Sequence, residues 1–309
     1  RKEEDKVEVY SGLFEGITTG MPLMLMVLNG DAKSKDYSDI KDLFRPGHAD
    51  YTYFAKYGYR DYRGGGRSSA RETIGRVIAG AIAKQLLSHL GVSIRGGLVQ
   101  VGNVLAKQLE WDQVEANDAR FLDSSLLPDV EAEIKEARLA RDSVGAVIQM
   151  EAYGVPVGLG DPAFARLDAL LAWAMMSIPA VKGVEVGGGF SLASRRGSEA
   201  NDQMDKNGFL KNDHGGTLGG ISTGAPIVLR FAVKPTSSIP REQNTVNTQF
   251  EETVVSTLGR HDPCVGIRAV PIAESMIAIT LLDCWLRQSA ATSLQELYLH
   301  RDAIDYPKA

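Results

Sequence analysis

The 309-residue sequence predicts a mixed α+β fold that forms one domain. Short runs of strand-forming residues occur along most of the chain, and amphipathic or apolar helical patterns separate several of them. No polar linker divides the chain, although its length would allow either one large domain or two ordinary ones. A hydrophobic content of 44% with 32 glycines is typical of a soluble globular protein with many tight turns. We therefore treat residues 1–309 as a single domain.

The predicted strands are recognised by their β-branched and aliphatic residues, several of which alternate with polar ones. Two strands precede the first predicted helix, and three follow it. They cover residues 7–13, 23–28, 93–101, 146–152 and 227–233.

The clearest predicted helix begins at Ser69, which has capping-box spacing to Glu72, and it stops at Gly91. A second helix begins at Asp161, where the next residue is a proline suited to a first helical turn, and it ends at Pro179. Both carry aliphatic residues at helical spacing, which predicts one buried face in each helix. In the first helix that face consists of Ile74, Val77, Ile78, Ala81 and Ile82.

A third predicted helix begins near Pro271 and is apolar almost all round as far as Trp285, as expected of a helix buried between other layers. Residues 131–141 form a shorter, more charged pattern that is typical of a surface helix. Long glycine-punctuated loops are expected at residues 57–67, 186–220 and 235–253. Loops of this length in a compact enzyme are usually functional or mobile.

Charge and composition disfavour several classes of function. The formal net charge is -5 and no run of basic residues stands out, which argues against binding to nucleic acid. The sequence has no stretch of about 18 apolar residues and no secretory leader, so it predicts neither a membrane-spanning nor a secreted protein. Cys264 and Cys284 have neither metal-ligand nor disulfide spacing. We therefore expect no metal site and a location in the reducing cytoplasm.

Residues 63–73 carry the strongest local indication of a binding site. Three glycines at 64–66 lie directly before the predicted helix that begins at Ser69. Glycines let the backbone approach a ligand closely, and a helix N-terminus offers unpaired N–H donors to an anion. Arg67 and Arg71 would add charge-assisted hydrogen bonds. The pattern indicates a phosphate site, although a plain capped helix after a flexible turn would have the same sequence.

Two histidine-containing motifs are candidates for proton transfer. In the first, His48 follows a Pro-Gly turn and lies three residues after Arg45, which can orient an anion beside it. In the second, Arg260, His261 and Asp262 are crowded just before the apolar third helix, where polar groups are costly unless they are satisfied or used. The alternatives are a structural role for His48 and a helix-capping role for Asp262.

A further polar segment, Lys234 to Ser238, ends the last predicted strand with one ammonium group and three hydroxyl groups. Such a set suits a phosphate or the polar edge of a ring. Gly219 lies in a second glycine-rich passage, residues 212–222, where the backbone can approach a flat ligand. Each of these segments, taken alone, is also compatible with a solvated loop.

Taken together, four motifs in this order resemble those of chorismate synthase. The likeness extends over essentially the whole chain, and it implies a single-domain β-α-β sandwich in which long core helices lie between antiparallel sheets. It also implies a homotetramer with reduced FMN as the cofactor, and NADPH only if the enzyme reduces its own flavin. The four motifs are Arg45-Pro46-Gly47-His48-Ala49-Asp50-Tyr51, Gly64-Gly65-Gly66-Arg67-Ser68-Ser69-Ala70-Arg71-Glu72-Thr73, Lys234-Pro235-Thr236-Ser237-Ser238 and Gly259-Arg260-His261-Asp262-Pro263-Cys264.

The reaction implied by the resemblance is an anti 1,4-elimination of phosphate from 5-O-(1-carboxyvinyl)-3-phosphoshikimate, without net redox change. The product is chorismate, formed in the last common step of aromatic amino-acid biosynthesis. His48 matches the histidine that keeps the reduced flavin correctly protonated, and Asp262 matches the carboxylate that accepts the substrate proton. Substrate anions are expected to meet Arg45, Arg71 and Arg260. Contacts to FMN are implied for Arg67, Ser68, Ser69, Ala180, Gly219, Lys234, Pro235, Thr236, Ser237, Ser238 and Arg260.

The resemblance has two gaps. The family's N-terminal Gly-Glu-Ser-His-Gly segment, whose histidine protonates the leaving phosphate, has no counterpart here, so we expect that histidine to come from sequence outside this chain. Pro179 and Ala180 stand where the family usually has Asn-Ala, which leaves only a backbone contact to flavin there. Three rival functions remain: a flavin-binding module without catalysis, a flavin oxidoreductase with another substrate, and a nucleic-acid-binding protein.

Overall fold

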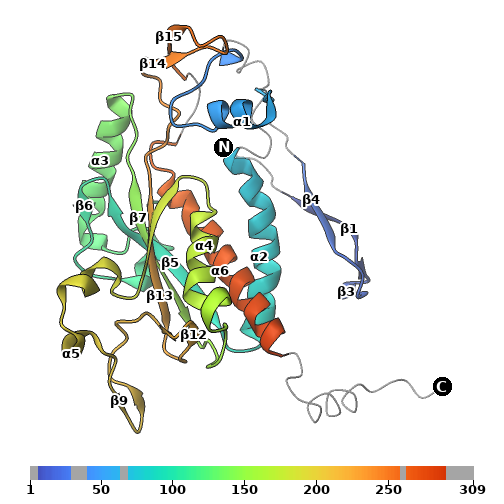
Figure 1. Cartoon of the computed structure of the whole chain (residues 1–309), viewed down its shortest axis with the longest axis vertical. Helices are drawn as coiled ribbons and strands as arrows, with labels where there is room; N and C mark the ends of the chain where they lie inside the picture. Colours follow the sequence, from blue (N-terminus) through green and yellow to red (C-terminus); the bar gives the residue numbers. More distant parts are fainter. Residues whose placement is uncertain (1–5, 29–39, 63–68, 258–261, 290–309) are drawn as a thin grey trace.

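The structure, a computed structural model, describes residues 6–28, 40–62, 69–257 and 262–289. At its centre lies a five-stranded antiparallel sheet with the strand order β6-β5-β7-β13-β8 (Figure 1). Strand β13 pairs with β7 on one side and with β8 on the other. The five strands are β5 (Ser93–Val101), β6 (Val104–Leu105), β7 (Ala146–Tyr153), β8 (Val181–Val186) and β13 (Ile227–Val233).

Helices α2, α4 and α6 form a layer on one face of this sheet (Figure 1). Helix α6 contacts the other two helices as well as β5 and β7, and it contributes much of the hydrophobic core. A further helix, α3, lies on the other side of the sheet near β5 and β6. The four helices are α2 (Thr73–Ser88), α3 (Leu127–Leu139), α4 (Leu167–Met176) and α6 (Gly266–Gln288).

Helices α2 and α6 approach each other closely at a glycine. A Cβ atom added to Gly80 would lie 2.2 Å from the Cβ atom of Ser275, so the contact leaves no room for a larger residue. Gly80 and Ala83 are buried on this side of α2, whereas Ile74 and Ala81 of the predicted face are exposed. The predicted face is therefore buried only in part: Val77, Ile78 and Ile82 are half-buried, and the close crossing is made by small residues beside them.

Helix α6 begins at Gly266, earlier than the start predicted near Pro271. Pro271 is accommodated inside the helix, and its carbonyl oxygen accepts a hydrogen bond of 2.7 Å from the Ser275 hydroxyl. Among the described residues, α6 is the one helix long and apolar enough to cross a membrane. Its composition has another cause here, because its buried residues form part of the protein core between the sheet and the other helices.

An outlying unit lies above the first turns of α2 and α6 (Figure 1). It combines α1 (Asp50–Tyr57) with the ribbon formed by β14 (Gln243–Val246) and β15 (Glu252–Val255). Phe44 joins the two parts: its backbone N–H donates to the Val246 carbonyl at 3.2 Å, and its ring packs against aromatic neighbours from both.

The remaining short elements lie at the periphery. Strands β1 and β4 form a ribbon on the α2 side of the molecule, away from the central sheet (Figure 1). These elements are β1 (Val7–Ser11), β2 (Leu13–Phe14), β3 (Ile17–Thr18), β4 (Met24–Val27), α5 (Gly197–Ala200), β9 (Met204–Asp205), β10 (Gly208–Phe209), β11 (Thr217–Leu218) and β12 (Ile221–Ser222).

The predicted mixed α/β fold class is confirmed, and β5 and β13 have the predicted bounds. Helix α4 begins only at Leu167, because the residues before it form a single 3-10 turn, Ala163–Ala165. Strand β14 and the first half of β15 lie inside a region expected to be loop. The second sheet of the sandwich stays a prediction, since the described part of the chain has on that side of the helices only the β1/β4 ribbon and the β2/β3 hairpin at its end.

The α2–α6 crossing generates a stability prediction. Gly80→Ala should lower the free energy of unfolding by about 1–3 kcal/mol, because the new methyl group overpacks a helix contact. Gly75→Ala is the matched control in the same helix, since a Cβ atom there meets nothing within 4 Å. That control should raise stability by up to about 1 kcal/mol through helix propensity. Urea unfolding measures both, and equal effects in the two variants would contradict the close crossing.

Candidate active site

The candidate site is built around residues 234–238, which leave the central sheet at the end of β13. Three hydrogen bonds from this segment reach separate parts of the chain. The backbone N–H of Lys234 donates to the Ala180 carbonyl at 2.9 Å, next to the start of β8. The Thr236 hydroxyl donates to the Asp262 carbonyl at 2.8 Å, and the Thr236 carbonyl accepts from Ser143 at 2.7 Å. We call residues 234–238 the hub of the site.

His48 lies against this hub. Its Nε2 atom is 2.7 Å from the Ser238 hydroxyl oxygen, and its Nδ1 atom is 3.0 Å from the Pro46 carbonyl oxygen. A carbonyl oxygen can only accept, so Nδ1 carries the proton of this bond, and in the neutral ring Nε2 accepts from Ser238. Burial and the positive charge of Arg45 lower the pKa of His48, which favours that neutral form.

Lys234 and Ser237 hold the turn that precedes His48 through hydrogen bonds to its Gly47 carbonyl. The Lys234 ammonium donates to the Gly47 carbonyl at 2.9 Å and to the Ser237 hydroxyl at 2.6 Å. Gly47 has a φ of +70°, and a Cβ atom there would lie 2.6 Å from the Ser237 oxygen. Glycine is therefore required at this position for both conformational and steric reasons. Burial, together with the charge of Lys182, lowers the pKa of Lys234.

Ala180 connects the hub to the helical layer. It has a φ of 72°, an uncommon conformation for a residue other than glycine and one that costs stability unless the surroundings enforce it. The preceding residues end α4, where the Ser177 hydroxyl accepts a hydrogen bond of 2.7 Å from Arg76 in the first turn of α2. The C-terminal end of α4, the N-terminal end of α2 and the end of β13 therefore lie together.

Ser69 and Arg71 precede α2 at this same end. Ser69 is the N-cap of a short 3-10 helix, Ala70–Glu72, and its side chain accepts from the Arg71 backbone N–H. The predicted capping box does not form, because the Glu72 carboxylate pairs with Arg76 at 2.9 Å instead. The other predicted residues of this motif, Arg67 and Ser68, lie outside the described residues, as does Arg260.

Arg45 is held by a buried carboxylate. Its Nε and Nη2 atoms donate to the two oxygens of Asp50 at 2.8 and 3.0 Å. Arg60 approaches the same carboxylate, with Nη1 3.1 Å from Oδ1. The exposed fractions of the three side chains are 14% for Arg45, 8% for Asp50 and 9% for Arg60. Reasoning from the sequence assigned no role to Asp50 or Arg60, since neither belongs to a periodic pattern.

Asp262 lies just before α6, but it does not cap that helix. Its carboxylate forms an ion pair with Arg268, with the Arg268 Nε atom 2.7 Å from Oδ2. Both side chains are about half exposed, so this pair is weak and solvent can compete for it. The capping alternative is therefore wrong, because the N-cap residue of α6 is Val265 and no side chain caps it.

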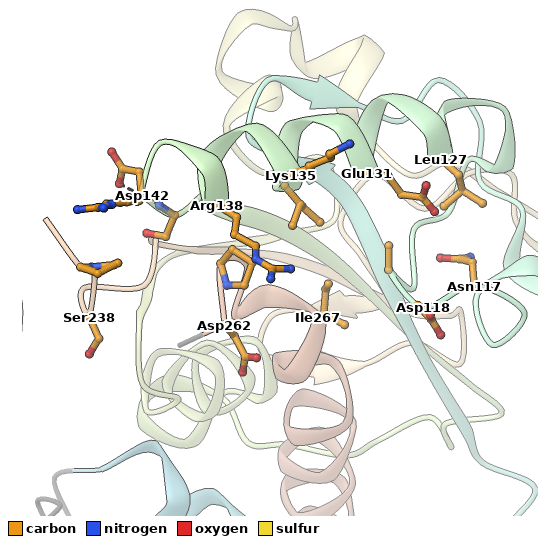
Figure 2. A pocket seen from close by; sticks show the side chains of 16 residues that line it. Asn117, Asp118, Leu127, Glu131, Lys135, Arg138, Asp142, Ser238, Asp262 and Ile267 are labelled. Carbon is orange, nitrogen blue, oxygen red and sulfur yellow. Dashed lines mark hydrogen bonds between the residues drawn. The ribbon is translucent and has the colours of Figure 1, made fainter. Parts of the chain in front are cut away.

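A pocket of about 850 Å³ opens beside the hub and is bordered by Ser238 and Asp262 (Figure 2). Helix α3 forms one wall, from which Lys135 and Arg138 extend, and Ile267 of α6 lies opposite (Figure 2). The volume is within the range of small-molecule sites. His48 and Lys234 do not line this pocket, so it lies beside the histidine and does not enclose it.

Gly219, another FMN candidate, lies away from the hub. It lies in the β11–β12 turn, and the neighbouring Gly220 carbonyl accepts from the backbone N–H of Leu167, the first residue of α4. Ala180 follows the opposite end of that helix. The 10 residues of α4 separate the two positions by roughly 15 Å at about 1.5 Å per residue.

The fold and the site together define a mixed α/β protein whose helical layer and sheet end converge on a cationic, histidine-containing site. The family model of chorismate synthase matches residues 1–286. A solved structure titled "Crystal Structure of Chorismate Synthase" superposes with a TM-score of 0.73 and 29% sequence identity, over 96% of this chain and 82% of that chain. The chain belongs to the chorismate synthase family, whose enzymes are carbon–oxygen lyases, and the resemblance read from the motifs is confirmed.

The lowered pKa of His48 predicts a specific dependence of stability on pH. The folded protein binds a proton at His48 less readily than the unfolded chain does, because His48 has its ordinary pKa of 6.5 in the unfolded chain. The neutral His48 therefore contributes its full stabilisation of the folded state above pH 6.5. This contribution is lost as the pH falls through the lower pKa that His48 has in the folded state. His48→Gln removes this proton, so from about pH 7 to about pH 5 it should lose less stability than the parent protein.

The matched control is His89→Gln, at the exposed end of α2. Urea unfolding across the pH range measures the three proteins. If the parent and His48→Gln lost stability in parallel, or if His89→Gln behaved like His48→Gln, the burial of a neutral His48 would be refuted.

Proposed function

We propose that this chain carries out the chorismate synthase reaction, the anti 1,4-elimination of phosphate from 5-O-(1-carboxyvinyl)-3-phosphoshikimate to give chorismate. The observation that carries the proposal is the meeting at one hub of the His48 ring, the Lys234 ammonium and the backbone of Asp262, which come from distant parts of the chain. Family membership supports the choice of this reaction over others that such groups could assist. The step would belong to aromatic amino-acid biosynthesis.

The residues around the hub fit reduced FMN as a cofactor. Within the described part of the chain, Lys234 donates to two acceptors, so its third N–H could donate to a phosphate or a polar ring edge. The hydroxyl oxygens of residues 236–238 keep acceptor capacity, and the backbone at Ala180 lies within hydrogen-bond reach of Lys234. Bound reduced FMN would lend electron density to the substrate without net redox change. NADPH would take part only if the protein reduces its own flavin.

The other residues proposed to contact FMN lie in different parts of the structure. Ser69 lies at the α2 end of the site. Gly219, at the far end of α4, could meet only a remote part of the same flavin or a flavin held by another copy of the chain. The second arrangement would agree with a homotetramer, which we also propose, together with a cytoplasmic location. The full set is Arg67, Ser68, Ser69, Ala180, Gly219, Lys234, Pro235, Thr236, Ser237, Ser238 and Arg260.

His48 and Asp262 have distinct proposed roles. His48 presents a neutral ring whose tautomer is set by the Pro46 carbonyl, so Nε2 can exchange a proton with a neighbour through or beside Ser238. This suits control of the protonation of a bound flavin. Asp262 carries a half-exposed carboxylate beside the pocket, and release of its ion pair with Arg268 would free an oxygen to accept the substrate proton.

The cations are proposed to bind the anionic groups of the substrate. Arg45 and Arg71 would each contribute one guanidinium. Arg260, which lies outside the described residues, would contribute a third. Positive charge held near the departing phosphate stabilises the negative charge that develops as the carbon–oxygen bond breaks. A site that excludes water strengthens that effect.

The proposal is tested by an anaerobic assay with chemically reduced FMN and the carboxyvinyl-shikimate phosphate. The chain is compared with a version extended by the family's Gly-Glu-Ser-His-Gly segment. We expect chorismate and phosphate in equal amounts, with no reductant consumed per turnover, and faster turnover in the extended version. Oxidation of reductant in step with product would indicate an oxidoreductase. Flavin binding without turnover in both versions would indicate a non-catalytic module, and either result would overturn the proposal.

Variants of the two proton-transfer candidates test the assignment of roles. His48→Ala and Asp262→Ala should each lower kcat by about 10²–10⁴ and change the Kd of FMN much less, since general acid–base groups contribute on that scale. His89→Ala and Asp112→Ala, both at exposed positions, are the matched controls. Phosphate release under anaerobic conditions measures kcat. Near-normal turnover in either of the first two variants would remove that residue from the mechanism.

A further inference from the structure

The carboxylate of Asp50 is the centre of a buried cluster at the start of α1. Oxygen Oδ2 accepts from the backbone N–H of Arg45 at 3.1 Å and from its Nε at 2.8 Å. Oxygen Oδ1 accepts from Arg45 Nη2 at 3.0 Å and lies 3.1 Å from Arg60 Nη1. Burial raises the pKa of Asp50, but the hydrogen bonds from Arg45 and the charges of both arginines outweigh it, so the pKa lies below its ordinary value. The carboxylate is thus ionised at neutral pH.

Arg60 fixes this cluster to the backbone. Its Nη2 atom donates to the carbonyl oxygens of Ile40 and Lys41, each at 3.0 Å, and of Leu43 at 2.6 Å. The segment before Arg45 is therefore tied to the end of α1 through one guanidinium. With 9% of its side chain exposed, Arg60 has little freedom to leave this position.

The cluster has two positive charges and one negative charge, so it keeps one net positive charge after internal pairing. Arg45 and Asp50 alone would form a neutral pair with little attraction for an anion. The added charge of Arg60 changes that balance, and its burial reduces screening by salt. A second anion near Arg45 would therefore still be attracted.

The geometry leaves one edge of Arg45 available. Asp50 occupies the edge formed by Nε and Nη2, while in the described part of the chain Nη1 makes no hydrogen bond. A guanidinium can bind a second anion through its remaining edge. Arg45 is also close to His48, since the His48 backbone N–H donates to the Arg45 carbonyl at 3.2 Å and the Arg45 charge acts on the His48 ring.

We propose that Asp50 and Arg60 are positioning residues for Arg45: Asp50 holds one edge of its guanidinium, and Arg60 offsets the carboxylate charge so that the other edge can bind a substrate anion. This inference rests on the proposed function of Arg45. Neither Asp50 nor Arg60 is proposed to touch the substrate. Their contribution is the orientation and the net charge of the residue that does.

The two variants Asp50→Asn and Arg60→Met separate positioning from simple charge. Asp50→Asn makes the cluster more positive, and it also weakens the contacts that orient Arg45. If Asp50 acts by positioning Arg45, the variant should bind substrate more weakly. If only the net charge mattered, the variant should bind substrate more tightly. Arg60→Met leaves a neutral Arg45–Asp50 pair, which also weakens binding. We expect the Kd of the carboxyvinyl-shikimate phosphate to rise about tenfold in each variant, the scale on which buried charge pairs act. The Kd of FMN should change by less than about twofold.

The same substitutions in an Arg45→Ala background provide the control. A residue that acts through Arg45 loses its effect there, so Asp50→Asn and Arg60→Met should then change the Kd of the substrate by less than about twofold. A general effect on the fold would persist in that background. Arg60→Lys keeps the positive charge but loses the guanidinium that donates to the backbone carbonyls. It serves as the second variant if Arg60→Met does not fold.

Calorimetric titration of the full chain with substrate, in the presence of oxidised FMN, measures these affinities without turnover. The result is therefore separate from the assay of the proposed reaction. Tighter substrate binding by Asp50→Asn, or equal effects with and without Arg45, would overturn the inference and leave the proposed reaction standing. If the parent chain bound no substrate, both would be overturned.

Discussion

The structure depends most on the pairing of β13 in the centre of the sheet. All seven of its residues pair with β7, and most also pair with β8, so its register is set from both sides. Alternate residues of β13 are buried, and a slip by one residue would expose them. Because Lys234 follows the last paired residue, this register fixes the place at which the hub leaves the sheet.

From that place the hub joins segments that are remote in sequence. His48 meets Ser238 across 190 residues, and Ala180 and Asp262 are joined to the hub through backbone carbonyls. The four polar side chains of the hub all make hydrogen bonds within the protein, which limits their conformations before any ligand arrives. A site prepared in this way loses less conformational entropy on binding than one assembled by the ligand. The strained backbone at Ala180 persists because these neighbours enforce it.

Much of the fold could be predicted from the sequence, because the central strands and α6 have strong apolar patterns. The buried face of α2 could not, since its contact at Gly80 depends on how closely another helix approaches. His48, Asp262 and the hub lie in motifs and were recognised. Asp50, although it lies in the first motif, and Arg60 were assigned no role, because the partners of a charged residue are decided only by the fold. The positive φ of Ala180 could not be predicted either, because alanine has no preference for that conformation.

The local charges of the site agree with the proposed binding of anions by an acidic protein. The chain has a net charge of -5, but the cluster of Arg45, Asp50 and Arg60 retains a positive charge, and Lys234 adds another. Local charges in half-buried positions dominate over distant ones, which salt screens. Burying the Lys234 ammonium near Lys182 costs stability, as the lowered pKa of Lys234 indicates. An anion bound there would relieve that cost, so binding and the stability of this end of the molecule are linked.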